Sequence, residues 1–214
     1  MHVVVAGGHG KIAMRLLDRL STRGDRAVGL IRNPDHAADL EAVGAEAQIA
    51  DLEELDAAQL APLLEGADAL VFAAGSGPGS GPERKRTLDL GGAVKLIEAA
   101  RLAEVERWVI VSSMGAGDPE SASEEMKPYQ RAKGEADEQL AKSGLGYTIV
   151  RPGKLTDDQG VGTVTVGEGI DYGEISRDDV AAVLIGVLET ENAIGKTFDL
   201  IGGDTPIDEA LESL

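Results

Sequence analysis

Short apolar runs alternate with longer amphipathic segments along the chain. Most of these runs hold Val, Ile, Leu and Ala with few polar residues, which is typical of strands buried on both faces of a sheet. The runs predict seven strands, at Val3–Ala6, Ala27–Ile31, Ala45–Ala50, Ala69–Ala74, Trp108–Ser112, Tyr147–Val150 and Thr197–Ile201. The alternation indicates an α/β protein built on a parallel sheet that helices cover.

Helical periodicity fills several of the intervals between these strands. It predicts helices at Lys11–Thr22, Ala57–Leu64, Arg86–Ala103 and Tyr129–Lys142. Because each strand–helix–strand crossover is right-handed, the sheet is predicted to be doubly wound. Two loops, at 75–82 and 115–126, follow predicted strands at the edge where such sheets bind their ligands.

Composition and charge exclude several classes of function. The 214 residues suit one domain, and 38 acidic against 20 basic residues give a net charge of −18, which repels nucleic acids and anionic membranes. Cysteine is absent, so disulfides and thiolate sites are excluded, and the three histidines lack metal-ligand spacing, so no metal site is expected. With no signal-peptide pattern and no apolar run of membrane-spanning length, we expect a cytoplasmic protein without a nucleic-acid or membrane partner.

A glycine-rich turn directly follows the first predicted strand. The segment Gly7-Gly8-His9-Gly10-Lys11-Ile12-Ala13 stands where that strand must turn into the first helix. Glycines permit the sharp turn and the close approach of a pyrophosphate, and the free amides and the dipole of the helix start favour its negative charge. The turn therefore predicts dinucleotide binding by Gly7, Gly8, His9, Gly10, Lys11 and Ile12.

The end of the second strand bears on which dinucleotide binds. An acidic residue at this position would bind the ribose 2′-hydroxyl of NAD, whereas the sequence has Arg32 followed by Asn33. A guanidinium group suits a 2′-phosphate, so NADP(H) is the preferred cofactor and NAD(H) the alternative, unless Arg32 only forms a surface ion pair. Asp51 and Leu52 close the third strand, where a carboxylate can meet an adenine amino group or cap the next helix.

Ser113, Tyr129 and Lys133 form a candidate catalytic group. The fifth strand ends in Ser112-Ser113, and a predicted helix carries Tyr129 and Lys133 four positions apart, on one helical face. A neighbouring ammonium group favours the phenolate form that acid–base catalysis by tyrosine needs. The pattern predicts that Tyr129 is the proton donor, that Ser113 hydrogen-bonds the substrate oxygen, and that Lys133 tunes Tyr129 and holds the nicotinamide ribose.

Together these motifs resemble the short-chain dehydrogenase/reductase superfamily. The resemblance is closest to its small atypical members, which include NmrA-like, biliverdin reductase B-like and NAD-dependent epimerase/dehydratase-like proteins. Besides the glycine turn and the Tyr-x-x-x-Lys pattern, the matching segments are Ile31–Pro34, Ala73–Pro78, Asp89 with Gly92, Leu96–Ala100, Val111–Gly115, Tyr147–Gly153 and Ile175–Ala181. These segments span nearly the whole chain.

The resemblance implies a Rossmann fold in a single domain, with a cofactor half at about 1–153 and a small substrate-side region at about 154–214. It implies further cofactor contacts at Arg32, Asn33, Asp51, Leu52, Ala73, Ala74, Gly75, Ser112, Tyr129, Lys133, Pro152 and Gly153. Two departures stand out: Ala13 replaces the usual third glycine, and the C-terminal region is smaller than the one with which extended epimerases enclose a nucleotide sugar. A UDP-sugar substrate is therefore not expected.

Two functions follow from these features. The first is an NADP(H)-dependent oxidoreductase that transfers a hydride to or from a small carbonyl or conjugated ring compound, as a monomer or homodimer. The alternative is a non-catalytic NADP(H)-binding redox sensor, which requires different affinities for the oxidised and reduced cofactor. The intact Tyr129–Lys133 pair favours the enzyme. The basic run Arg84-Lys85-Arg86 is interpreted as a solvated helix face, and Trp108 and Ala181–Leu188 as core.

Overall fold

The strands of the chain form one large sheet and one small one. The computed structural model describes residues 1–77 and 79–214. Its strands are β1 (His2–Ala6), β2 (Arg26–Ile31), β3 (Glu46–Ile49), β4 (Ala69–Phe72), β5 (Arg107–Val111), β6 (Gly146–Pro152), β7 (Lys154–Thr156), β8 (Thr163–Gly167), β9 (Glu174–Ser176), β10 (Lys196–Gly202) and β11 (Thr205–Pro206). The seven predicted strands correspond to β1 to β6 and β10, with ends shifted by one or two residues.

Helices occupy the crossovers between the strands. They are α1 (Lys11–Thr22), α2 (Ala37–Ala42), α3 (Ala57–Leu60), α4 (Pro82–Arg84), α5 (Gly91–Leu102), α6 (Lys127–Ala141), α7 (Arg177–Glu189) and α8 (Ile207–Glu212). A π-helical segment, Lys85–Leu90, joins α4 to α5, so the helix expected at Arg86–Ala103 begins earlier than predicted. In the part of the chain that the structure describes, no helix is both long enough and apolar enough to span a membrane.

Parallel pairing dominates the large sheet. Across the described residues its strand order is β11-β8-β10-β6-β5-β4-β1-β2-β3. Neighbouring strands from β3 across to β10 pair in parallel, whereas β8 runs antiparallel to both β10 and β11. The chain starts at β1, winds outward to β3, and then returns through β4 to the other side. This order confirms the predicted doubly wound parallel sheet.

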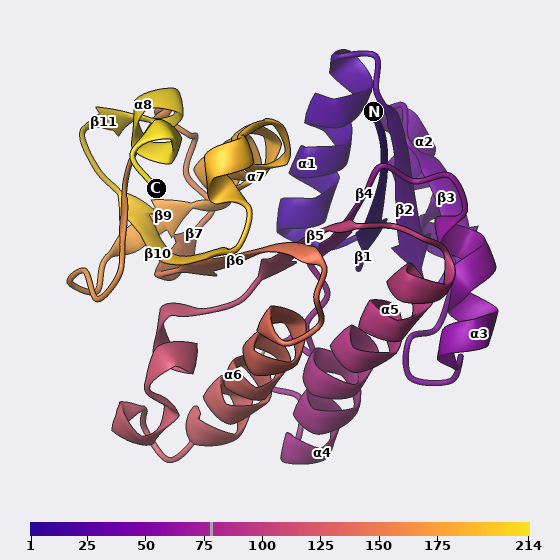
Figure 1. Ribbon diagram of the computed structural model, residues 1–214, viewed down its shortest axis with the longest axis horizontal. Coiled ribbons are helices and arrows are strands. Elements are labelled where there is room, and N and C mark those ends of the chain that lie inside the picture. The colour runs from indigo at the N-terminus through magenta and orange to yellow at the C-terminus, as the bar shows by residue number, and fades with distance from the viewer. Residues whose placement is uncertain (78) are drawn as a thin grey trace.

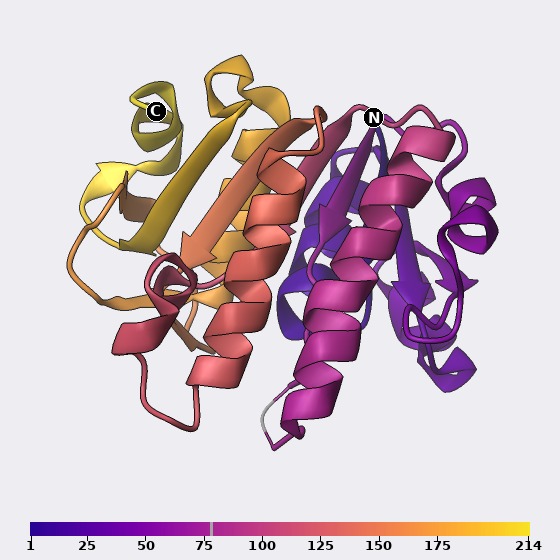
Figure 2. The same ribbon diagram turned by 60° about the horizontal axis from the view of Figure 1, so that its bottom comes forward.

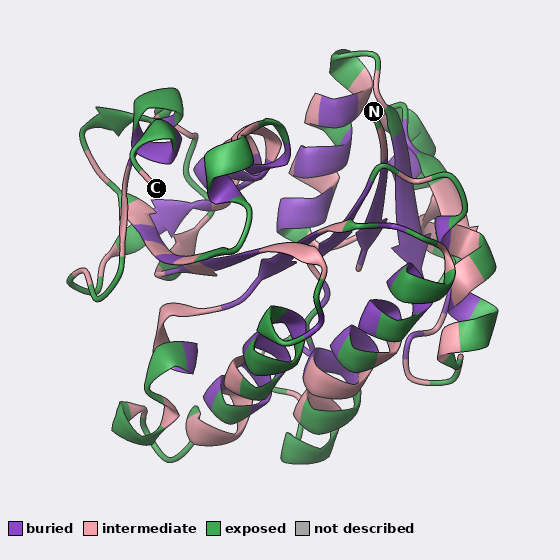
Figure 3. Ribbon diagram, in the orientation of Figure 1, coloured by how far each residue is buried: buried purple, intermediate pink, exposed green. Residues whose placement is uncertain are grey.

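Helices cover both faces of this sheet (Figure 1). Helices α1 and α7 pack side by side on one face, and α5 and α6 lie on the other, as Figure 2 also shows. Strand β1 supplies Val3 and Val5 to the apolar cluster on the first face and Val4 and Ala6 to the cluster on the second. Buried residues accordingly run along the central strands and the inward sides of the helices (Figure 3). A strand that faces two cores has no polar side, which explains the uninterrupted apolar runs.

Helix α7 is the main element that the sequence did not predict as such. Its stretch Ala181–Leu188 was assigned to the core, and most of that stretch is buried. The helix packs against α1, α8 and the sheet, so apolar residues surround much of its circumference and no single stripe marks it as amphipathic. Its start is nevertheless marked, because the Ser176 hydroxyl accepts a hydrogen bond from the amide of Asp179 at 2.9 Å.

The antiparallel edge of the sheet was also missed. Strand β8 reads Thr163-Val164-Thr165-Val166, a period-two alternation in which Val164 is fully buried. Such alternation is typical of a strand with one face on the core and one toward solvent. Strands β7 and β9 add a separate two-stranded parallel sheet. The final residues dock as α8, with Ile207 and Leu211 buried.

The turn between β1 and α1 offers a direct test of this packing. Gly7 has φ +80°, and a Cβ placed on it would lie 2.6 Å from the Cα of Ala74. Gly24 has a similar φ of +84° with no atom within 4 Å of such a Cβ. We expect Gly24→Ala to lower the free energy of unfolding by about 1 kcal/mol through backbone strain alone. Gly7→Ala should lower it by about 2–4 kcal/mol, because overpacking adds to the strain.

Urea unfolding of the two variants measures this difference. Equal losses of stability for Gly7→Ala and Gly24→Ala would show that the turn has room for a side chain, contrary to the structure.

Candidate functional site

The glycine turn lies closely against the backbone of two neighbouring strands. Gly7 faces Ala74, just beyond the end of β4, and a Cβ on Gly8 would lie 2.8 Å from the Cα of Gly29 in β2. The Gly10 amide donates a hydrogen bond to the Gly7 carbonyl at 2.8 Å, which closes the turn before α1 begins. These contacts hold the start of α1 at the carboxyl end of β1.

The first turn of α1 is open to an anion. Gly10 is its N-cap, and within the described residues no side chain caps this helix start and no acidic residue occupies its first turn. Helix α7 provides the contrast, since Ser176 caps it and Asp178 and Asp179 lie in its first turn. The amides at the start of α1 therefore keep their hydrogen-bonding capacity and the positive end of the helix dipole.

A cavity of about 290 Å³ opens beside this helix start. It is walled by the glycine turn, by the ends of β2 and β3, and by the segment that follows β4. Ten of the predicted cofactor-binding residues line it: Gly7, His9, Gly10, Arg32, Asn33, Asp51, Leu52, Ala73, Ala74 and Gly75. Residues far apart in the sequence thus meet at one edge of the sheet, as expected for the carboxyl ends of parallel strands.

The remaining predicted cofactor residues lie outside the lining of this cavity. Gly8 and Ile12 are buried under the turn, and Lys11 is exposed, where its ammonium pairs with Asp157 at 2.5 Å. Pro152 ends β6, and the amide of Gly153 donates to the Leu200 carbonyl at 2.9 Å. A Cβ on Gly153 would collide with the carbonyl of Gly173, so this turn is also packed against backbone.

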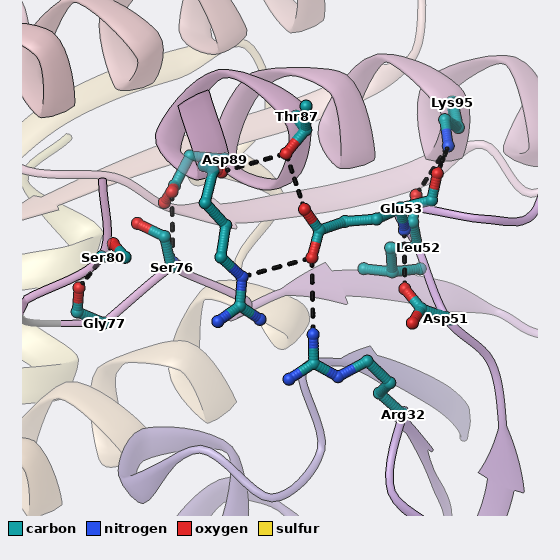
Figure 4. A network of polar contacts seen from close by, with 11 residues as sticks. Arg32, Asp51, Leu52, Glu53, Ser76, Gly77, Ser80, Thr87, Asp89 and Lys95 are labelled. Carbon is teal, nitrogen blue, oxygen red and sulfur yellow. Dashed lines mark hydrogen bonds and ion pairs between the residues drawn. The ribbon is translucent and has the colours of Figure 1, made fainter. Parts of the chain in front are cut away.

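At the rim of the cavity, Glu53 joins two arginines (Figure 4). Its Oε2 lies 3.5 Å from Nη1 of Arg32 and 3.2 Å from Nε of Arg84, and its Oε1 accepts a 2.6 Å hydrogen bond from the Thr87 hydroxyl. The hydrogen bond from Thr87, followed by the hydrogen bond and charge of Arg84 and the charge of Arg32, lowers the pKa of Glu53 despite its partial burial. Glu53 therefore stays ionised at neutral pH.

Two histidines stack beside the glycine turn. The rings of His9 and His36 are 3.7 Å apart between centroids with an interplanar angle of 15°. Nε2 of His9 lies 2.8 Å from Oδ2 of Asp39 in α2. Both histidines line the cavity, so the stack forms part of its wall on the side of α2.

Lys133 is the most deeply buried of the three predicted catalytic residues. Its ammonium donates hydrogen bonds to the carbonyls of Val111 (3.1 Å) and Ala74 (3.4 Å), and it lies 3.5 Å from Oδ1 of Asp89. Asp89 is fully buried, and its Oδ2 accepts a hydrogen bond from the Ser76 amide at 3.1 Å. One buried ion pair therefore ties α6 and the π-helical segment to the segments that leave β4 and β5.

Tyr129 and Ser113 lie near the start of α6, and Ser112 contacts its second half. The Lys133 ammonium lies 6.0 Å from the centroid of the Tyr129 ring, which agrees with their predicted common face. The Ser113 hydroxyl accepts a hydrogen bond from Nε2 of Gln130 at 3.1 Å, so the end of β5 reaches this helix. The Ser112 hydroxyl is turned inward and donates to Oδ2 of Asp137 at 2.9 Å.

Asp137 connects α6 to the ends of β5 and β6. Its Oδ2 also accepts a hydrogen bond from Nε of Arg151 at 2.9 Å. Burial raises the pKa of Asp137, although Arg151 and the Ser112 hydroxyl oppose the rise. Ser112 is consequently held as a structural link between β5 and α6, with its hydroxyl directed away from solvent.

Comparison with known proteins identifies the family. Residues 7–191 match a protein-family model described as NAD(P)H-binding. The chain belongs to this NAD(P)H-binding family. The match confirms the expected nicotinamide cofactor in its general form, and the open helix start and crowded glycine turn are features that fit a dinucleotide pyrophosphate.

Relatives and solved structures agree with the family over the whole chain. The sequence is 42% identical over 215 residues to the Bacillus subtilis protein named "Uncharacterized sugar epimerase YhfK", covering 100% of both chains. A solved structure from Bacillus halodurans is described as a NAD-dependent epimerase/dehydratase. It has a TM-score of 0.94 at 39% identity, and the match covers 100% of both chains. The oxidoreductase ylbE from Lactococcus lactis has a TM-score of 0.90 at 31% identity, with 100% of this chain and 96% of that chain covered. These likenesses confirm the small atypical type of short-chain dehydrogenase/reductase.

Within this family site, the sequence alone did not indicate Glu53 or Arg84. Arg84 belongs to the basic run that was interpreted as a solvated face, yet it is only partly exposed and lines the cavity. Glu53 directly follows the predicted cofactor residues Asp51 and Leu52, and this position was the only sequence feature that could have pointed to it. Arg84 had no local signal, because 31 residues separate it from Glu53.

The buried pair of Lys133 and Asp89 predicts a large effect on stability. Asp89→Ala would leave a buried ammonium without its counter-charge, and we expect the free energy of unfolding to fall by about 3–5 kcal/mol. Glu138→Ala on the same helix α6 removes the partner of Lys142 in an exposed pair and should change stability by less than about 0.5 kcal/mol. Urea denaturation compares the two variants. Similar losses for both would contradict a buried, structurally required ion pair.

Proposed function

We propose that the chain is an NADP(H)-dependent oxidoreductase that acts on a small carbonyl or conjugated ring compound with Ser113, Tyr129 and Lys133. The observation that carries the proposal is the cavity at the uncapped start of α1, which has Arg32 at its rim. A guanidinium group at this position suits the 2′-phosphate that distinguishes NADP from NAD. NAD(H) remains the alternative cofactor.

The chain's own groups supply the binding. The open amides at the start of α1 would hold the pyrophosphate, and the close packing of Gly7 against Ala74 fixes the turn that presents them. Asp51 and Leu52, at the end of β3, line the far part of the cavity and suit the adenine. When bound, a nicotinamide cofactor supplies or accepts a hydride.

Tyr129 and Lys133 support proton transfer. In the proposed mechanism the Tyr129 hydroxyl gives its proton to the substrate oxygen, and the Lys133 ammonium, 6.0 Å from the ring centroid, stabilises the negative charge left behind. The carbonyls of Val111 and Ala74 and the Asp89 carboxylate fix that ammonium in place. Ser113 orients the substrate oxygen, with Gln130 holding its hydroxyl.

A compact substrate is the class favoured by the fold of the region after residue 154. The region after Lys154 folds as a few short strands with α7 and α8, most of which complete the large sheet. The Bacillus subtilis relative carries the name of a sugar epimerase, and the Lactococcus lactis relative that of an oxidoreductase. Because most strands of this region complete the large sheet, its fold supports an oxidoreductase with a compact substrate.

The role of Tyr129 is tested by removing its hydroxyl. Tyr129→Phe should lower kcat by about 100-fold or more, because the proton donor is lost, while the Kd for NADPH changes by less than about twofold. Tyr147 lies at the amino end of β6, away from the Pro152 end. Tyr147→Phe therefore serves as the control and should leave both kcat and Kd unchanged. Rates are followed by NADPH absorbance with a panel of carbonyl, quinone and flavin compounds. An unchanged rate in Tyr129→Phe would show that Tyr129 is not the proton donor.

The cofactor preference is tested at Arg32. Arg32→Ala should weaken NADPH binding by about tenfold or more through the loss of a charge-assisted contact, with little change for NADH. Arg131→Ala, which removes an exposed arginine on α6 paired with Glu120, is the matched control. Calorimetric titration measures the Kd of the parent and of both variants for NADPH and for NADH. If NADH and NADPH weaken equally in Arg32→Ala, the proposed preference for the phosphorylated cofactor is wrong.

A further inference from the structure

Glu53 is held more firmly than a surface carboxylate requires. The Lys95 ammonium donates 2.8 Å hydrogen bonds to the backbone carbonyls of Leu52 and Glu53, which fixes the main chain at this point. The side chain is then oriented by the Thr87 hydroxyl, as Figure 4 shows. As a result the Glu53 carboxylate is presented at the cavity wall and is only 22% exposed.

The two arginines reach this carboxylate from different elements. Arg32 extends from the end of β2 with its side chain 54% exposed, and Arg84 comes from α4 with its side chain 38% exposed. Each contact to Glu53 uses one guanidinium nitrogen, at 3.5 Å for Arg32 and 3.2 Å for Arg84. The remaining N–H groups of both side chains can serve a second acceptor. All three residues line the cavity.

This arrangement places one anionic group between two cations in a cavity otherwise suited to a nucleotide. Carboxylates and phosphates both accept hydrogen bonds from guanidinium groups, so a phosphate can take the place of a carboxylate that lies between two arginines. A phosphate dianion entering the cavity near Arg32 would attract Arg84 as well, and it would repel the ionised Glu53. Exchange of Glu53 for the phosphate keeps both arginines paired.

We propose that Arg84 is a second specificity-determining residue, which joins Arg32 on the cofactor 2′-phosphate, and that Glu53 is the internal carboxylate that this phosphate displaces. The inference rests on the proposed NADP(H) function and deepens it. Glu53 holds the two arginines together before the cofactor arrives, and its charge limits the affinity for the phosphorylated form. NADH has no 2′-phosphate, so its affinity is independent of both residues to a first approximation.

The test compares Arg84→Gln and Glu53→Gln in the full-length protein. Calorimetry yields the Kd for NADPH and NADH, and for adenosine 2′,5′-bisphosphate and 5′-AMP, two probes that differ only in the 2′-phosphate. We expect Arg84→Gln to weaken NADPH and the bisphosphate by about tenfold. Glu53→Gln should strengthen both by about three- to tenfold. NADH and 5′-AMP should change by less than about twofold in each variant.

Arg86→Gln is the matched control. It removes the same charge two residues away, at an exposed position outside the cavity lining, and should leave every ratio unchanged. Thermal unfolding of each variant establishes that the fold is retained. A fall in NADPH affinity with Arg86→Gln equal to that with Arg84→Gln would reveal a general charge effect and overturn the proposal.

Two further outcomes are distinguishable. If the parent protein binds neither NADPH nor NADH, the proposed function itself fails. If NADPH binds with the expected dependence on Arg32, but Arg84→Gln weakens NADPH and NADH equally or not at all, only the role of Arg84 is overturned. A loss of NADPH affinity in Glu53→Gln would likewise overturn displacement of Glu53, because it would show that the carboxylate is needed in the complex.

Discussion

The site depends on how closely the turn after β1 approaches the backbone of its neighbours. Gly7 lies against Ala74 and Gly8 against Gly29, at distances that leave no space for a Cβ. Because β1 lies between β2 and β4 in the sheet, this contact sets the start of α1 beside the carboxyl ends of these two strands. The cavity beside α1 then follows from the geometry of the sheet. Its chemistry follows from the uncapped amides of that helix and from Arg32.

A second constraint joins the cofactor cavity to the proposed proton donor. The Lys133 ammonium bonds to carbonyls just beyond β4 and at the end of β5, and pairs with Asp89 in the π-helical segment. The same π-helical segment contributes Thr87 to Glu53 at the cavity rim. The π-helical segment therefore contacts both the cavity, through Glu53, and the candidate catalytic group, through Lys133. Helical turns of this type occur frequently at functional sites. Glu53 and Lys133 are therefore both held by contacts with this segment.

Local sequence patterns were sufficient to predict the parallel core and the glycine turn. Strands β1, β2, β4 and β5 are uninterrupted or nearly uninterrupted apolar runs, and the glycine turn follows β1 directly, so neither requires knowledge of distant contacts. Helix α7 was missed because its neighbours cover most of its circumference, which removes the amphipathic stripe. The contact of Arg84 with Glu53 forms only when α4 is placed beside the end of β3, so no pattern within 31 residues reveals it. The burial of Lys133 against Asp89 is non-local for the same reason.

The central claim is that a nicotinamide dinucleotide binds across the glycine turn at the start of α1. Amide hydrogen exchange, followed by mass spectrometry with and without saturating NADPH, tests it most directly. We expect slower exchange in peptides that cover residues 7–13 and 73–76, which contain Gly7, Gly10, Ala73, Ala74 and Gly75 of the cavity lining. Peptides covering the capped start of α7, at residues 176–180, should exchange at the same rate in both states. Unchanged exchange at residues 7–13, or protection confined to other parts of the chain, would contradict the account.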